Sequence, residues 1–67
     1  MKPKEFKQIA KENGVLIGKI KSYKRGDYRG YLITHFTILN EKTTSSDYTS
    51  DFFNMNLYEI AKEWFNL

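Results

Sequence analysis

The chain has 67 residues, of which 40% are apolar and 16% aromatic, and it contains no cysteine. Such a composition predicts one compact domain over residues 1–67, because the chain is too aromatic to stay disordered and too short for two cores. The lack of cysteine excludes disulfides and thiolate metal ligands, and no apolar run approaches the roughly 18 residues that span a bilayer. We therefore expect a soluble, cytoplasmic protein without a membrane partner.

The net charge of +3 is unevenly distributed along the chain. Residues 1–40 hold nine Lys or Arg and three acidic residues, which gives a net charge of +6, whereas residues 41–67 carry a net charge of −3. A charge asymmetry of this kind can orient a protein on a polyanion or on an acidic partner.

The first helix is predicted near the N-terminus. Pro3 suits the first position of a helix, and Asn13-Gly14 is typical of the end of one. The apolar residues between them have the i, i+3, i+4 spacing of a helix face and are Phe6, Ile9 and Ala10. Because this stripe is short, we expect the helix to need a sheet to pack on.

The second helix is predicted at the C-terminus. Asn56 can cap it, Glu59 can complete a capping box with Asn56, and Met55 can pack against Ile60 as a hydrophobic staple. Its apolar face follows helical spacing to the end of the chain and consists of Leu57, Ile60, Ala61, Trp64 and Phe65.

Between the helices, β-branched and alternating residues predict one strand near 15–24 and a second near 30–40. The hydroxyl-rich segment EKTTSSDYTSD, at 41–51, predicts a loop in its first half, followed by a short third strand near 47–53. The chain is therefore expected to have an α+β fold with the order α-β-β-β-α. Its antiparallel sheet would have two or three strands, and both terminal helices would pack on one face.

The hairpin segment SYKRGDYRGY, residues 22–31, decides which side chains share a face of the sheet. We expect a loop of odd length, 26–28 or 25–29, because a two-residue turn at Gly26-Asp27 would scatter lysines and aliphatic residues over both faces. The expected core face then holds Leu16, Gly18, Ile20, Leu32, Phe36 and Ile38, with Gly18 opposite Phe36. The expected exposed face holds Ile17, Lys19, Lys21, Tyr23, Tyr31, Ile33, His35 and Thr37. Gly30 is expected at a bulge or at the start of the second strand.

The residues needed for catalysis are not grouped in the sequence. A hydrolytic or transfer site needs a nucleophile with a base, or paired carboxylates, and the chain has a single histidine, His35. Asp47 and Asp51 are better explained as solvated loop acids than as metal ligands. We therefore expect no enzyme activity, no metal and no cofactor.

The basic and aromatic hairpin suggests nucleic-acid binding instead. Lysine and arginine neutralise phosphates, tyrosine rings can stack on bases, and a two-stranded ribbon can enter a major groove. The residues expected to make these contacts are Lys19, Lys21, Tyr23, Lys24, Arg25, Tyr28, Arg29, Tyr31 and His35. The competing interpretation is a solvated sheet face with ordinary charges at a hairpin tip.

The order of elements resembles that of double-stranded RNA-binding domains and of the small arm-binding domains of phage-type integrases. This resemblance implies a nucleic-acid partner and covers element order only. The lysine-rich signature that begins the second helix of the RNA-binding family is replaced here by Asn56, Leu57, Tyr58 and Glu59, so no functional residue is carried over.

Two further functions are compatible with the sequence. The protein could be an inhibitor or adaptor of the kind encoded by phages and mobile elements, which binds a protein partner, or a second copy as a homodimer, through its aromatic sheet face or an open strand edge. Arg25-Gly26-Asp27 also matches an adhesion tripeptide, but a chain without disulfides does not suit an extracellular ligand.

Overall fold

The computed structural model describes residues 1–44 and 47–67. Its elements are α1 (Pro3–Glu12), β1 (Val15–Arg25), β2 (Tyr28–Asn40), β3 (Thr43–Thr44), β4 (Tyr48–Phe53) and α2 (Leu57–Phe65). This order confirms the expected α+β class with a helix at each end. The two-residue strand β3 was not expected, because its segment was predicted as a loop; Ser45 and Ser46 of that predicted loop lie outside the described residues.

Both helices begin where the sequence predicts, and α1 also ends where it predicts. Pro3 occupies the first turn of α1, and Gly14 follows the helix with a φ of 78°, a conformation that favours glycine. At α2, the Asn56 side chain accepts a hydrogen bond of 2.8 Å from the Glu59 backbone, and the Glu59 carboxylate accepts one of 3.1 Å from the Asn56 backbone. The predicted capping box is thereby confirmed.

Strand β2 is the centre of an antiparallel sheet. It pairs with β1 along one edge and with β4 along the other, and β3 pairs with its last residues. The prediction of a third main strand near 47–53 is confirmed by β4, in which Phe53 lies beside Gly30 and Tyr48 beside His35.

The register of the β1–β2 hairpin differs from the expected one. Arg25 pairs with Tyr28, so the turn is the two-residue Gly26-Asp27, and Gly26 has the positive φ (58°) that such turns need. The register then shifts between Ile17 and Lys19, where Gly18 is the extra residue of a bulge. The predicted odd loop is therefore wrong. Beyond the bulge, residues of equal parity pair again, so that Leu16 lies opposite Phe36.

With this register, the face of β2 that was expected to be exposed is the buried one, and the face that was expected in the core is the open one. Ile33 is fully buried beneath the helices and Ile17 is buried beside it, whereas Leu16 remains 41% exposed on the other side. Leu32 and Phe36, which were expected in the core, share the face of Leu16. The buried core consists of Phe6, Ala10, Ile17, Ile33, Leu57, Ile60, Ala61 and Phe65.

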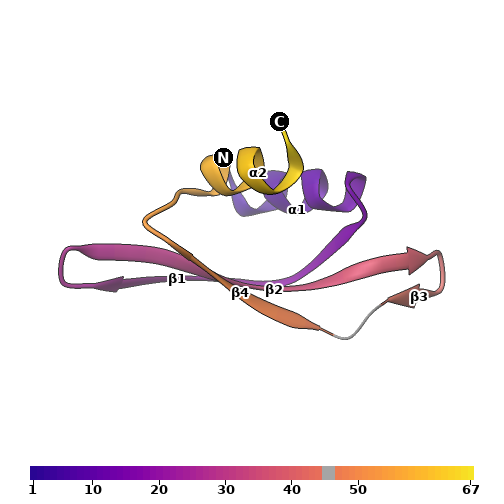
Figure 1. Cartoon of the computed structure of the whole chain (residues 1–67), viewed down its shortest axis with the longest axis horizontal. Helices are drawn as coiled ribbons and strands as arrows, with labels where there is room; N and C mark the ends of the chain where they lie inside the picture. Colours follow the sequence, from indigo (N-terminus) through magenta and orange to yellow (C-terminus); the bar gives the residue numbers. More distant parts are fainter. Residues whose placement is uncertain (45–46) are drawn as a thin grey trace.

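The molecule has two layers, with α1 and α2 side by side on one face of the sheet (Figure 1). The Phe6 ring of α1 packs on Phe65 and Trp64 of α2, which ties the helices together above the sheet. The strands run beyond the helices at both ends and give the molecule extents of 42 × 23 × 17 Å. Neither described helix is long and apolar enough to cross a membrane.

Candidate functional site

The face of the sheet opposite the helices, here called the open face, carries most of the chemistry expected of a binding site. Five of the nine predicted contact residues lie on it. In an antiparallel ladder paired residues share a face, and these five alternate along their strands with the residues that face the helices. They are Lys19, Lys21, Tyr23, Arg25 and Tyr28. Among the described residues no helix covers this face (Figure 1).

Three cations form a line along β1, here called the basic row: Lys19, Lys21 and Arg25. Successive side chains on one face of a strand are about 7 Å apart, so the row extends for about 20 Å with Tyr23 between its last two members. All three side chains are exposed. A row of this kind can meet several charges of an extended polyanion at once.

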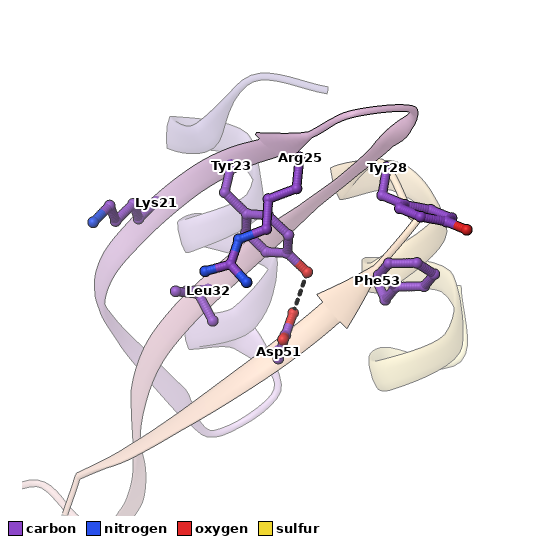
Figure 2. A pocket seen from close by; sticks show the side chains of 7 residues that line it. All are labelled: Lys21, Tyr23, Arg25, Tyr28, Leu32, Asp51 and Phe53. Carbon is purple, nitrogen blue, oxygen red and sulfur yellow. Dashed lines mark hydrogen bonds between the residues drawn. The ribbon is translucent and has the colours of Figure 1, made fainter.

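Tyr23 connects the basic row to the far strand of the sheet. Its hydroxyl donates a hydrogen bond of 2.6 Å to a carboxylate oxygen of Asp51 on β4 (Figure 2). To reach it, the ring passes over Gly30, where an added Cβ would lie only 2.6 Å from the Tyr23 hydroxyl oxygen. Gly30 is thus an interior residue of β2 whose missing side chain makes room for Tyr23, and not the bulge or strand start that was expected.

The hydrogen bond also changes the acidity of Tyr23. Donation to Asp51 raises the pKa of the Tyr23 phenol above its ordinary value of 10.0, and desolvation and the negative charge of Asp51 act in the same direction. The positive charge of Arg25 opposes them more weakly. The phenol therefore remains neutral at physiological pH, and its hydrogen atom stays committed to Asp51.

Near the hairpin turn, two aromatic rings face the solvent side by side. Tyr28 on β2 and Phe53 on β4 are 55% and 53% exposed, and their ring centroids are 5.2 Å apart with an interplanar angle of 39°. They form one end of a shallow hollow of about 360 Å³ on the open face (Figure 2). The hollow is lined by Lys21, Tyr23, Arg25, Tyr28, Leu32, Asp51 and Phe53.

Two of the predicted contact residues lie at the hairpin tip but on its other face. Lys24 and Arg29 are register partners and alternate with the basic row along their strands. The backbone of Arg29 is held by Asn54, the residue after β4, since the Arg29 carbonyl accepts a hydrogen bond of 2.7 Å from the Asn54 backbone. Their charges contribute to the positive potential of the tip without joining the hollow.

The last two predicted residues, Tyr31 and His35, lie on the helix-covered face. Tyr31 packs against the buried core. The His35 ring meets Trp64 edge to face at 4.7 Å, and its Nε2 lies 2.8 Å from the Ser50 hydroxyl. The expected position of both residues beside Lys19 and Lys21 is wrong, because the two-residue turn shifts β2 by one residue relative to β1.

The environment of His35 favours the neutral form of its ring. Burial lowers the pKa of the imidazole below its ordinary value of 6.5, because the protonated form loses hydration. A neutral ring beneath Trp64 is suited to packing and hydrogen bonding.

Sequence reasoning missed three residues of the hollow: Leu32, Asp51 and Phe53. Leu32 was expected in the core because the predicted odd loop placed it on the face of Ile20, whereas it pairs with Lys21. Asp51 and Phe53 belong to a strand that was predicted, and the parity of β4 places both on the face of Tyr23. The sequence did not predict which residues of β2 pair with this strand, and therefore not that Phe53 lies beside Gly30.

The described residues contain no group of three or more His, Asp or Glu side chains that could hold a metal ion. In comparisons with known proteins, no family model matches the chain, and neither the curated proteins nor the solved structures yield a significant match.

Proposed function

We propose that this is a cytoplasmic, non-enzymatic nucleic-acid-binding protein that uses the open face of its sheet. One observation carries the proposal: the basic row of Lys19, Lys21 and Arg25 lies on the same uncovered face as exposed aromatic rings. Cations that contact phosphates release condensed counterions, which favours binding. Tyrosine and phenylalanine rings add sequence-tolerant contacts to bases or sugars.

The charge pattern of the hairpin supports a polyanionic ligand. Its residues 19–29 include five cations and one acid, Asp27, so the hairpin is far more basic than the chain as a whole. The hairpin also projects beyond the helices (Figure 1), and a ligand can therefore reach it without meeting α1 or α2. A long, exposed basic ribbon can follow a phosphate backbone.

The test is a salt titration of binding with a matched pair of charge-reversal variants. Fluorescently labelled DNA and RNA oligonucleotides would be titrated by anisotropy at several salt concentrations. With three phosphate contacts, the slope of log K against log salt is expected near −2 for single strands. Lys21→Glu with Arg25→Glu is expected to abolish measurable binding.

The control is Lys4→Glu with Lys7→Glu, which changes the net charge equally but on α1, on the other side of the molecule. This control is expected to retain most of the affinity, since only distant charge is altered. Absence of binding by the wild-type protein at low salt, or equal losses in the two double variants, would contradict a specific role of the open face.

A second candidate is protein binding through the free edge of β4. Within the described residues β4 pairs with β2 alone, and its sequence, YTSDFF, contains no Lys or Pro that would hinder the addition of a strand. A second copy or an extended peptide could pair there. Light scattering from 10 µM to 1 mM protein and hydrogen exchange of the β4 amides would test self-association, which should raise both mass and protection with concentration.

A further inference from the structure

The two long sides of the open face carry different kinds of side chain. Where β1, β2 and β4 lie side by side, every cation of this face comes from β1. The facing positions of β2 and β4 carry Tyr28, Leu32, Asp51 and Phe53 instead. The β1 and β4 backbones are two strand spacings, or about 10 Å, apart. One side of the face is thus cationic, and the other is aromatic and acidic.

We propose that the ligand of this face is a single strand of nucleic acid, with its phosphates along the basic row and its bases over Tyr28 and Phe53. This inference rests on the proposed function and names its substrate class. A duplex presents two rows of phosphate on either side of a groove and keeps the faces of its bases stacked inside the helix. The open face has cations on one side only, and Asp51 on the other side would repel a second row of phosphates.

The aromatic pair is suited to bases that are not already stacked. Both residues are about half exposed, and their rings are tilted by 39° relative to each other at one end of the hollow (Figure 2). A base of a single strand can stack on such a ring, whereas a paired base in a duplex cannot. Asp51 is an acceptor that the amino group of a base can approach in the same hollow.

The experiment compares probes that share a phosphate backbone but differ in their bases. Labelled oligo(dT) and oligo(U), an abasic oligonucleotide of equal length and a duplex of equal length would be titrated by anisotropy at one low salt concentration. The wild-type protein is expected to bind the two single strands at least tenfold more tightly than the abasic strand or the duplex. Tyr28→Ala and Phe53→Ala should each weaken single-strand binding by about 5- to 150-fold, the range for one stacked base, and leave abasic binding within about twofold.

The matched control is Tyr58→Ala, which removes a ring of similar exposure (54%) from α2. It should leave all four affinities unchanged. Equal binding of all probes, or tighter binding of the duplex, would overturn the single-strand inference while nucleic-acid binding stands. If the protein binds none of the probes, the proposed nucleic-acid binding is itself contradicted.

Discussion

The Tyr23 hydroxyl and the Asp51 carboxylate form a 2.6 Å hydrogen bond that joins β1 to β4 across the intervening strand β2. Adjacent strands are connected by backbone hydrogen bonds, but this contact links two strands that are not neighbours. It depends on Gly30, because the Tyr23 ring passes through the space that any larger side chain would fill. The hairpin, whose tip extends beyond the helices, is thus fastened to the rest of the sheet by a side chain.

Gly30→Ala is expected to destabilise the fold. The new Cβ would lie 2.7 Å from the Phe52 carbonyl oxygen and 2.7 Å from the Tyr23 ring carbon that bears the hydroxyl. Forcing an extra methyl group into a packed site costs about 1–3 kcal/mol. The free energy of unfolding from urea denaturation would measure the loss.

The same substitution in a Tyr23→Ala background provides the control. Removal of the ring relieves two of the three close contacts, so Gly30→Ala should cost less there, and the remaining cost should reflect the Phe52 carbonyl. An identical cost in both backgrounds would show that Tyr23 does not occupy the space above Gly30.

Tyr23 is expected to lose its proton at higher pH than an ordinary tyrosine. Because the hydrogen bond to Asp51 raises its pKa in the folded state above 10.0, the native protein holds this proton more tightly than the unfolded chain does. The resulting stabilisation is present below pH 10 and is lost as the pH rises through the folded pKa. An NMR titration of tyrosine Cζ carbons would measure it directly.

Asp51→Asn should lower the pKa of Tyr23, since it removes the charge and weakens the hydrogen-bond acceptor. Asp47→Asn, with the same change in net charge just before β4, should leave it unaltered. If both variants shift the Tyr23 titration equally, the shift arises from overall charge and not from the hydrogen bond.

The stability of the protein is expected to fall in mildly acidic solution because of His35. Its pKa is lowered below 6.5 by burial, so between the folded pKa and 6.5 the unfolded chain binds more protons than the native state. The contribution of His35 is therefore complete above pH 6.5 and is lost as the pH falls through the folded pKa. Denaturant unfolding from pH 5 to 7 should show this slope, and His35→Gln should remove it.

A direct measurement of the same group is the NMR titration of the His35 ring protons. A pKa at or above 6.5 would contradict the burial of the ring beside Trp64. Glu63 and Asp51 line the neighbouring surface hollow with His35. Repeating the titration in Glu63→Gln would separate the influence of that carboxylate from desolvation.

Asn56→Ala is expected to destabilise the protein by about 1 kcal/mol, because it leaves the Glu59 backbone amide without its capping partner. Thermal or urea unfolding would measure the change. Asn66 offers the contrast, since it sits beyond the other end of α2 with a φ of 55°. Asn66→Gly should be neutral or slightly stabilising there; a loss as large as that of Asn56→Ala would contradict these roles.

The helices were predictable because their signals are local. Pro3, the Asn56 capping box and the two apolar stripes all act within one or two turns, and each is found in the structure as expected. Strands β1, β2 and β4 were predictable for the same reason, since alternation within one strand indicates where it runs.

The pairing of strands was less predictable because it depends on features that alternation does not reveal. On β1, Lys19, Lys21 and Tyr23 share a face as expected, but their partners on β2 are shifted by one residue. The two-residue turn at Gly26 shifts the pairing of β1 with β2 by one residue, and the bulge at Gly18 shifts it back. From the sequence alone, this combination cannot be distinguished from a longer loop without a bulge. The expected grouping of Lys19, Lys21 and Tyr23 is therefore found, whereas Tyr31 and His35 lie on the opposite face of the sheet.

The eight buried core residues all belong to the helices or to the covered side of the sheet, and none lines the open face. The buried core and the residues proposed to bind nucleic acid are thus separate sets of amino acids in a very short chain. Substitutions at Lys19, Lys21, Arg25 and Phe53 are therefore expected to leave the interior undisturbed. The same separation makes the sheet a natural surface for a combinatorial library, in which new specificities can be selected on an unchanged scaffold.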